Sequence, residues 1–402
     1  MALMPVADAL AAVLADAEPL AHEMVALDDC FHRVLACDVA SLRTQPPQAM
    51  SAMDGYAVRA VDATQHARLT VIGEVAAGRP FDRVLGANEA IRIFTGGVIP
   101  EGADAVVIQE DTARDGATVF IHEAARLGRH IRPAGVDFST GDVLLRAGAR
   151  LTDRDLSLAA GMNHPELPVR RRPKLALLAT GDELVMPGSI PGPGQIVYSN
   201  GYALRALARH EGAEVVDLGI AADTHLATVA GIRRARDLQA DILITTGGAS
   251  VGDHDLVQQA LTAEGVTMAF WKIAMRPGKP MMHGRIGPMR VIGLPGNPVS
   301  SYVCALLFMV PLIRALQGRR DIHHELEPAL LGRDVGANDM REDYLRAVLA
   351  VREDGALVAT PVTRQDSSLL GNLSAAHCLV VRAAHAPAAS AGTPCSVLRL
   401  PL

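Results

Sequence analysis

Glycines and carboxylates gather directly after one apolar run of this sequence. The run DILITT over 241–246 is rich in β-branched residues, and the segment after it contains Gly247, Gly248, Ser250, Gly252, Asp253, His254 and Asp255. Glycines at a strand end let backbone N–H groups approach a phosphate, although the Gly-Lys-Ser/Thr of a Walker motif is missing. Carboxylates behind such a loop suit a divalent cation with oxygen ligands, such as Mg²⁺. The alternative is a tight turn into a helix, with His254 on the surface.

Two further apolar runs end in acids. KLALLAT over 174–180 is followed by Asp182 and Glu183, and EVVDLGI over 214–220 is followed by Asp223. Helix capping is the alternative explanation for Asp182 and Asp223. In open parallel sheets, ligands bind beyond the carboxyl ends of the strands. We therefore expect these acids to share one edge of a sheet.

A stiff basic loop lies between these runs and a probable helix start. The segment RPGKP over 276–280 clamps Arg276 and Lys279 between prolines and a glycine, which favours an anionic ligand such as a phosphate or an oxyanion. The segment GLPGNPVS over 293–300 is a rigid turn that feeds a helix N-terminus, which is a ready anion site. The alternative is that one of the two cations pairs with Asp253.

Composition excludes several classes of protein. The 402 residues are 49% hydrophobic and 20% charged, which is typical of a globular protein of several domains. A net charge of -6 offers no general attraction to nucleic acid or to an anionic membrane. The five cysteines form no C-x-x-C pair, so we expect a cytoplasmic protein without a cysteine metal site. No targeting segment is expected, and the apolar stretch Tyr302 to Ile313 is expected to be a buried helix.

The spacing of apolar residues predicts four units. From Lys174 to about Gly318, strands alternate with helices over 200–210 and 224–238, which predicts a doubly wound parallel α/β sheet. Short β-rich runs fill 45–145, between helical patterns over 6–40 and 151–168, so the β part is expected to be an insertion. The tail is expected to form a small β-barrel or sandwich, with an Asp-Gly hairpin turn. The expected fold is multidomain α/β, with a helical N-terminal unit over 1–44 and 141–172, an inserted β-rich domain over 45–140, an α/β domain over 173–325 and a C-terminal β-barrel domain over 326–402.

Six blocks of sequence resemble one known family. In chain order they are SAMDGYAVRA (51–60), TGGVIPEGADAVVIQED (95–111), TGDEL (180–184), TTGGASVGDHD (245–255), RPGKP (276–280) and GLPGNPVSS (293–301). They resemble the molybdopterin molybdenumtransferases, the bacterial molybdenum insertases that are similar to the insertase domain of gephyrin. The resemblance spans about residues 5 to 402.

The resemblance implies an activity and its partners. It implies an elongated homodimer of four-domain subunits that takes adenylylated molybdopterin and molybdate, needs Mg²⁺, and yields molybdenum cofactor with release of AMP. The adenylyltransferase and molybdoenzyme apoproteins are the protein partners that it suggests. Alternative functions are a molybdopterin adenylyltransferase, which the long N-terminal half argues against, and a gephyrin-like scaffold, which the retained acids and bases argue against.

The resemblance also implies roles for residues. Glu183, Asp223 and Asp255 are expected to handle the metal and the pyrophosphate as catalytic acids, and Arg276 and Lys279 to face the terminal phosphate and the oxyanion. Other expected substrate-binding residues are Gly247, Gly248, Ser250, Gly252, Pro280, Asn297, Ser300, Arg341, Ser367 and Ser368. Asp54, Thr95 and Asp137 are expected to form a second cluster on the β domain that faces the pocket of the other subunit.

Three departures from the family pattern affect these expectations. Arg276 stands where the family usually has lysine, so the charge is kept but the geometry changes. The segment Gln48-Ala49-Met50 replaces polar residues before SAMDGYA. Asp366 adds an acid beside the expected oxyanion site, where it repels molybdate unless its side chain points away.

Overall fold

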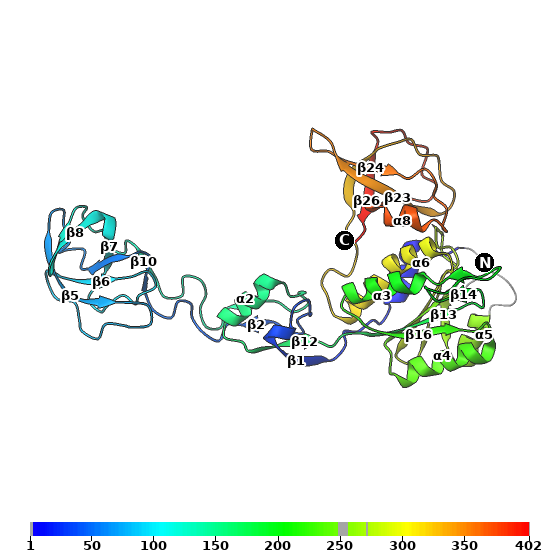
Figure 1. The fold of residues 1–402 in the computed structure, drawn as a ribbon, viewed down its shortest axis with the longest axis horizontal. Coiled ribbons are helices and arrows are strands. Elements are labelled where there is room, and N and C mark those ends of the chain that lie inside the picture. The colour runs from blue at the N-terminus through cyan, green and yellow to red at the C-terminus, as the bar shows by residue number, and fades with distance from the viewer. Residues whose placement is uncertain (1–2, 248–255, 271, 402) are drawn as a thin grey trace.

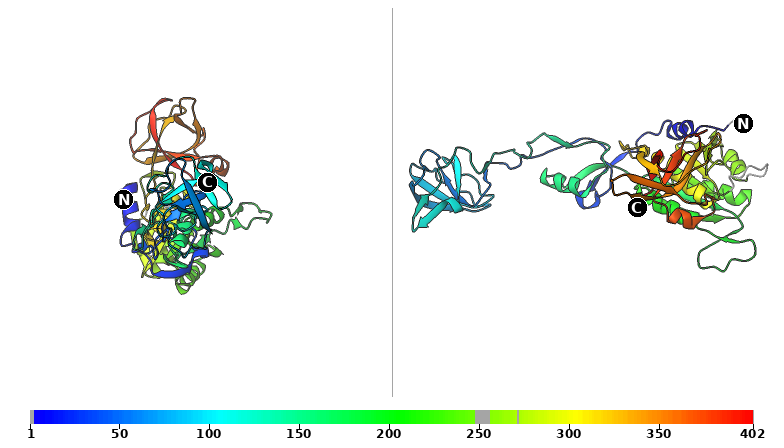
Figure 2. Two further views of the ribbon diagram at one scale, coloured as in Figure 1. Left: turned by 90° about the vertical axis from the view of Figure 1, so that its left-hand side faces the viewer. Right: turned by 90° about the horizontal axis from the view of Figure 1, so that it is seen from above.

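The chain is elongated. In a computed structural model that describes residues 3–247, 256–270 and 272–401, a small β unit at one end is joined through a narrow arm to an α/β unit, and a C-terminal barrel packs on the α/β unit (Figure 1). Figure 2 shows that two segments of the chain run between the arm and the distal β unit. The predicted multidomain α/β fold is confirmed.

The α/β unit is built on one six-stranded sheet. Its order is β16-β13-β17-β21-β20-β18, with parallel pairing among the first four strands and antiparallel pairing at β20 and β18. The strands are β13 (Lys174–Thr180), β16 (Glu214–Ala221), β17 (Ile242–Thr246), β18 (Thr267–Phe270), β20 (Met282–Ile286) and β21 (Met289–Leu294), beside a short pair β14 (Leu184–Val185) and β15 (Ile196–Val197). The sequence predicted the parallel strands and not the antiparallel edge.

Helices cover both faces of this sheet. They are α3 (Asn200–His210), α4 (His225–Asp237), α5 (Leu256–Ala263), α6 (Pro298–Cys304) and α7 (Val310–Leu316). One apolar core joins the sheet to α3, α6 and α7, and a second joins it to α4 and α5. Strand side chains alternate between the two faces, so Ile242 and Ile244 enter the first core whereas Leu243 enters the second. The run is apolar throughout because both faces are covered.

A continuous helical stretch fills the centre of the first core. Residues Pro298–Leu316 are long and apolar enough to span a bilayer, but 89% of the most apolar window lies buried inside the structure. A π-helical turn η3 (Ala305–Met309) separates α6 from α7 directly before Pro311, which has no N–H to donate. The predicted buried helix over 302–313 is confirmed as a core element.

The first helix of the chain packs away from the arm. The sequence groups residues 1–44 with 141–172, but α1 (Val6–Leu14) contacts α7. The helix buries Ala9 and Val13 in the larger core of the α/β unit. Arg290, which is 3% exposed, donates to the carbonyl oxygens at the end of this helix, at 2.7 Å to Ala15. Apolar spacing predicted the helix but not the surface that it covers.

The arm contains one helix and short paired strands. Its elements are β1 (His22–Ala26), η1 (Leu27–Asp29), β2 (Val39–Ala40), β11 (Val143–Leu145), α2 (Asp153–Gly161) and β12 (Glu166–Arg170). Thr152 caps α2, and its backbone N–H donates to Asp155 Oδ2 at 2.8 Å. The helix ends earlier than the predicted residue 168. The chain reverses at Asn163, which has a positive φ, and then forms β12, which pairs with β1.

The distal unit and the tail are both β structures, as predicted. The distal sheet has the order β7-β4-β6-β5-β9-β8, and five tail strands close into a barrel in which β23 pairs with both β24 and β25. The distal elements are β3 (Met50–Ser51), β4 (Gly55–Val58), β5 (Arg68–Val75), β6 (Glu89–Ile93), β7 (Ala105–Ile108), η2 (Gln109–Asp111), β8 (Thr112–Asp115), β9 (Thr118–Ile121) and β10 (Ile131–Arg132). The tail elements are β22 (Glu327–Leu331), β23 (Glu342–Val351), β24 (Leu357–Pro361), α8 (Leu370–Ser374), β25 (Cys378–Arg382) and β26 (Pro394–Arg399).

A buried charge network lies where the arm meets the α/β unit. The Glu211 side chain is 2% exposed and accepts from Arg314 Nη2 at 2.8 Å and from Arg319 Nη1 at 2.7 Å. Arg150 of the arm donates from Nη2 to the carbonyl oxygen of His210 at 2.6 Å. Burial alone raises the pKa of Glu211, but the two guanidinium groups outweigh it and leave the pKa below its ordinary value. The network therefore ties the arm to the unit that it must orient.

Candidate functional site

The predicted acids of β13 and β16 come together at the carboxyl edge of the sheet. The backbone N–H of Asp223 donates to Asp182 Oδ1 at 3.0 Å, and that of Asp182 donates to Asp223 Oδ2 at 3.3 Å. Glu183 lies over Gly181, where an added Cβ would be 2.6 Å from Glu183 Oε2. All three acids are exposed. Thr224 caps α4, so Asp223 does not cap this helix and its carboxylate can face a ligand.

The glycine loop starts against the same edge. Gly247 follows β17 with φ +89, and a Cβ at this position would be 2.3 Å from the carbonyl oxygen of Thr180 at the end of β13. Only glycine permits both this backbone conformation and this approach. Gly296 of the fourth loop lies beside Gly247, with an added Cβ 3.9 Å from the Gly247 Cα. The other predicted residues of the loop, Gly248, Ser250, Gly252, Asp253, His254 and Asp255, lie outside the described residues.

The basic loop joins the α/β unit to the barrel. Strand β19 (Met275–Arg276) pairs in parallel with β23, and Arg276 Nε donates to Asp343 Oδ1 at 2.9 Å. The Asp343 side chain is 4% exposed whereas that of Arg276 is 47% exposed, so the buried acid holds the arginine from beneath. The partner of Arg276 among the described residues is thus an acid of the barrel, and the Asp253 that the sequence offered lies outside them. Lys279 is exposed and has no ion pair within the described part of the chain, and Pro280 is half-buried.

A loop of the barrel covers part of the predicted helix-start anion site. The backbone N–H of Val299 in α6 donates to the carbonyl oxygen of Ser367 at 3.0 Å, and Asn297 Nδ2 donates to Ser367 Oγ at 3.0 Å. Ser300 is 5% exposed. One N–H of the helix start is therefore satisfied within the chain. The barrel loop and the helix start form one seam, which the separate motifs did not reveal.

The added acid Asp366 points into its own loop. Its Oδ1 accepts from the backbone N–H of Ser368 at 2.8 Å and from Ser368 Oγ at 2.7 Å. These two hydrogen bonds lower the pKa of Asp366. The carboxylate is thus satisfied locally, but it also engages the Ser368 hydroxyl that the sequence assigned to substrate.

Sequence reasoning missed Arg346 at this seam. Its side chain is fully buried, Nη2 donates to the carbonyl oxygen of Asp366 at 3.0 Å, and Nε and Nη1 have no hydrogen-bond partner within the described residues. The Gln365 side chain forms two hydrogen bonds with the backbone of Arg346. Its Oε1 accepts from the Arg346 N–H at 3.0 Å, and its Nε2 donates to the Arg346 carbonyl oxygen at 2.9 Å. Buried polar groups are nearly always partnered, so these two nitrogens are available to a water or a ligand, while Nη2 ties β23 to the loop of Asp366 and Ser367. The available signal was one arginine within the apolar run LRAVLAV.

The predicted cluster on the distal unit is partly assembled and remote from the acids. Asp54 Oδ1 accepts from the backbone N–H of Thr95 at 2.7 Å and from Thr95 Oγ1 at 2.8 Å, and both bonds lower the pKa of Asp54. Asp137 lies where the chain returns to the arm, and its N–H donates to the carbonyl oxygen of Gln45 at 3.1 Å. The distal unit and the α/β unit lie at opposite ends of the elongated molecule (Figure 1). One chain therefore does not bring Asp54 to Asp223.

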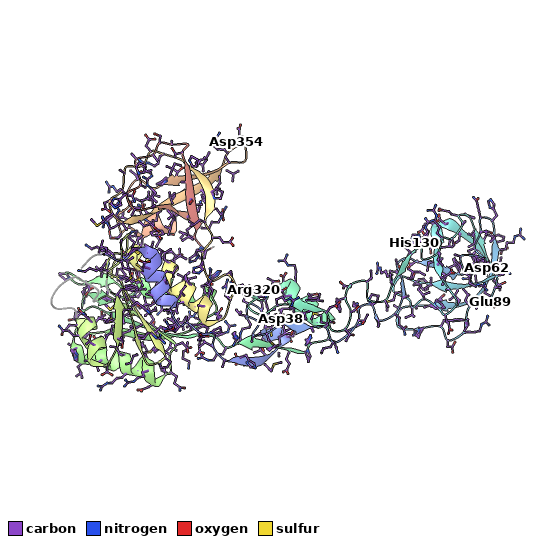
Figure 3. The ribbon with its side chains drawn as sticks, turned by 180° about the vertical axis from the view of Figure 1, so that it is seen from behind. Asp38, Asp62, Glu89, His130, Arg320 and Asp354 are labelled. Atoms are coloured by element: carbon purple, nitrogen blue, oxygen red, sulfur yellow. The ribbon has the colours of Figure 1, made fainter. Side chains whose placement is uncertain are left out.

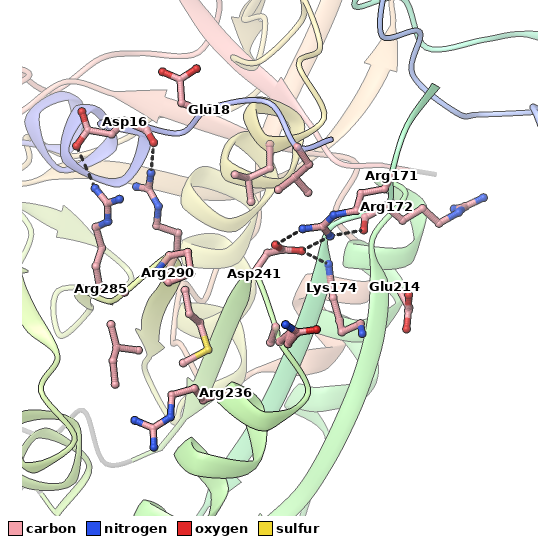
Figure 4. Close-up of a pocket in the computed structure, with 18 of the residues that line it drawn as sticks. Asp16, Glu18, Arg171, Arg172, Lys174, Glu214, Arg236, Asp241, Arg285 and Arg290 are labelled. Carbon is pink, nitrogen blue, oxygen red and sulfur yellow. Dashed lines mark hydrogen bonds and ion pairs between the residues drawn. The ribbon is translucent and has the colours of Figure 1, made fainter. Parts of the chain in front are cut away.

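A large cavity lies at the opposite edge of the α/β sheet. Its volume is about 1020 Å³, and charged residues at the amino ends of the strands line it (Figure 4). Asp241 accepts from Arg171 Nη1 at 2.8 Å and from the Lys174 N–H at 2.8 Å, and Arg285 pairs with Asp16. Among the predicted site residues that the structure describes, none lines it. Glu183, Asp223 and Gly247 lie instead at the carboxyl edge, and Asn297 lies at the barrel seam.

Three family models match the chain in order. The MoeA N-terminal region (domain I and II) matches residues 4–162, a probable molybdopterin binding domain matches 176–315, and the MoeA C-terminal region (domain IV) matches 328–400. The carboxyl-edge acids and the basic loop fall in the second match, whereas the Asp54 cluster falls in the first.

Named relatives and solved structures are similar over most of the chain. The molybdopterin molybdenumtransferase of Haemophilus influenzae is 36% identical over 369 residues, which cover 90% of each chain. That of a Nostoc species is 40% identical over 304 residues, 74% of this chain and 70% of the relative. The crystal structure of a molybdopterin biosynthesis MoeA protein from Pyrococcus horikoshii matches with a TM-score of 0.85 and 30% identity, over 99% of each chain.

Proposed function

This chain belongs to the molybdopterin molybdenumtransferase family, and from that premise we propose that it inserts molybdenum from molybdate into adenylylated molybdopterin with release of AMP. The observation that carries the proposal is the seam described above. At this seam the basic loop of β19 pairs with the barrel and the Ser367 loop lies on the start of α6. Gly296, just before α6, lies beside Gly247 at the sheet edge that carries the acids of β13 and β16. Acids for a metal and cations for an oxyanion on one edge fit a phosphorylated, metal-assisted substrate.

The acids fit Mg²⁺. Asp182, Glu183 and Asp223 offer only oxygen donors, which Mg²⁺ prefers. No group of three His, Cys, Asp or Glu residues within the described ranges is close enough to hold a metal. We propose Glu183 and Asp223 as ligands together with Asp255, which the family resemblance implies and which lies outside those ranges. The chemistry that the ion supplies is neutralisation of phosphate oxygens as the pyrophosphate bond breaks.

The chain's own groups have separate tasks in this proposal. The backbone at Gly247, which only a glycine allows to lie against the end of β13, is assigned to a nucleotide phosphate. Arg276 and Lys279 hold the oxyanion, and Arg341 faces it from the barrel. The seam between α6 and the Ser367 loop limits the access of water. A tetrahedral oxyanion held there lies beside the site of the phosphate ester.

The direct test uses the purified full chain with adenylylated molybdopterin, Mg²⁺ and molybdate, and follows AMP. AMP release that depends on molybdate supports the proposal. AMP release that is equally fast without molybdate contradicts it, as does the formation of adenylylated molybdopterin from molybdopterin and ATP.

Lys279→Ala is expected to raise the molybdate concentration needed for half-maximal insertion. Lys279 is exposed, and it has no ion pair among the described residues, so we assign its charge to the ligand. Loss of one charge-assisted contact costs roughly 1.5–3 kcal/mol, so the rise should be about tenfold or more. Lys279→Arg should recover part of the loss, and Lys272→Ala serves as the matched control. An unchanged molybdate requirement in Lys279→Ala removes this residue from the site.

We further propose a homodimer in the cytoplasm whose pocket uses both chains. The remote Asp54–Thr95 pair supports this, because a second copy can bring it to the acids. Inactive Asp54→Ala chains mixed with inactive Asp223→Ala chains should regain part of the activity, since a mixed dimer holds one intact composite site. Light scattering reports the oligomer. A monomer, or no recovery after verified subunit exchange, contradicts the shared pocket.

A further inference from the structure

We propose that Asp339 is an internal counterion that competes with the oxyanion for Arg341 and so raises the oxyanion concentration that the site requires. The inference rests on the proposed function only for the placement of the anion site. It concerns a residue that none of the sequence motifs contains, in the turn that enters β23.

The carboxylate of Asp339 occupies the binding face of Arg341. Arg341 Nη2 donates to Asp339 Oδ2 at 2.6 Å and Nε donates to Asp339 Oδ1 at 3.0 Å. This two-pronged arrangement is the one in which a guanidinium binds an oxyanion. The pair also holds the pKa of Asp339 below its ordinary value, so the competitor stays charged. An oxyanion that uses both donors of Arg341 must displace it.

The two acids at the seam differ in what they can do. The Asp343 side chain is 4% exposed beneath Arg276, so it is fixed and orients that arginine. The Asp339 side chain is 46% exposed and faces solvent. An exposed ion pair contributes little free energy, so Asp339 can swing into water when a stronger ligand arrives. Asp343 is thus a support and Asp339 a displaceable competitor.

Hydrogen bonds other than the one that the Asp339 carboxylate accepts from the Arg341 backbone N–H also hold this turn. Asn338 Nδ2 donates to the carbonyl oxygens of Ala383 at 2.7 Å and of Arg341 at 2.9 Å. The N–H of His385 donates to the carbonyl oxygen of Asp339 at 2.7 Å. Release of the carboxylate therefore frees the Arg341 side chain and one backbone N–H, while these other hydrogen bonds still hold the turn.

The test is Asp339→Asn in the full chain. The Arg341 backbone N–H donates to Asp339 Oδ1 at 2.9 Å. Asparagine keeps an oxygen that can accept this hydrogen bond, and the substitution removes only the charge. Isothermal titration with molybdate alone, and separately with sulfate alone, should give dissociation constants about two- to fivefold lower than in the parent, the range expected for loss of an exposed competing ion pair. Arg341→Gln should weaken binding of both anions.

The matched control is Asp354→Asn. Asp354 pairs with Arg352 at 2.8 Å with similar spacing and exposure, at the tip of the β23–β24 hairpin (Figure 3). The Asp354→Asn variant should bind molybdate and sulfate with the same affinity as the parent. Equal affinities in the parent and Asp339→Asn, or no oxyanion binding in either, overturn the inference. Tighter binding in Asp339→Asn without molybdate-dependent AMP release in any form leaves this inference standing and overturns the proposed function.

Discussion

Asp223→Asn is expected to lower the rate of AMP release at least about tenfold, a barrier increase of roughly 1.4 kcal/mol, while the melting temperature stays within a few degrees. Asp223 follows β16 in an exposed turn, and Thr224 rather than Asp223 caps the next helix. The substitution removes a charge from the proposed metal site. The hydrogen bond from the Asp182 N–H to the side-chain oxygen can persist.

The control for this variant is Asp237→Asn. Asp237 is an exposed acid at the end of the same helix α4, at the opposite edge of the sheet. Its replacement should leave AMP release unchanged. Added Mg²⁺ should partly restore Asp223→Asn if the residue is a ligand. Normal AMP release in Asp223→Asn removes it from the site, and a large fall in melting temperature reassigns it to the fold.

Glu211→Gln is expected to lower the free energy of unfolding of the α/β unit by about 3 kcal/mol, as when one partner of a buried ion pair is removed. Its side chain is 2% exposed and joins Arg314 and Arg319, so the amide leaves two guanidinium groups without their buried counter-charge. Urea unfolding measures the change. Glu327→Gln, at an exposed pair with Arg399, should cost at most about 1 kcal/mol. Equal effects of the two variants contradict a stabilising role for the network.

The difference in free energy of unfolding between Glu211→Gln and the parent should depend on pH. The folded-state pKa of Glu211 lies below its ordinary value, so its contribution is fully present above the ordinary glutamate range. The contribution is lost as the pH falls through the depressed folded pKa. Unfolding curves of parent and variant should therefore converge in acid and separate near neutral pH. A difference in unfolding free energy that stays constant from acid to neutral pH contradicts this pH dependence.

The parts of the fold set by neighbouring residues could be predicted closely. The predicted run over 174–180 coincides with β13, and the helix predicted over 200–210 coincides with α3. The Asp-Gly turn joins β23 to β24 with Gly355 at φ +82. Apolar period, caps and turn residues act over a few positions, so one sequence contains their full signal.

Local signals misplaced elements whose ends depend on a partner. The helix after Thr152 stops at Gly161 because the next residues pair with β1, more than 130 positions earlier. Strands β18 and β20 add an antiparallel edge to the predicted parallel sheet. Such pairings depend on which edge is free in the folded chain, and apolar period does not report that.

The sequence by itself determined which chemistry the chain carries. It placed acids after β13 and β16, glycines after β17, and two cations in one loop that contains two prolines. Adjacent residues suffice for this, because they determine where strands end and where turns form. Only the tertiary structure decided how those groups are used. It paired Arg276 with Asp343, set Ser367 on the start of α6 and buried Arg346 beneath the same loop. It also kept the distal β unit, which carries Asp54, at the end of the molecule away from the α/β unit. These outcomes depend on which surfaces of separate units meet, and burial and charge pairing across such a seam join residues that are far apart in the sequence.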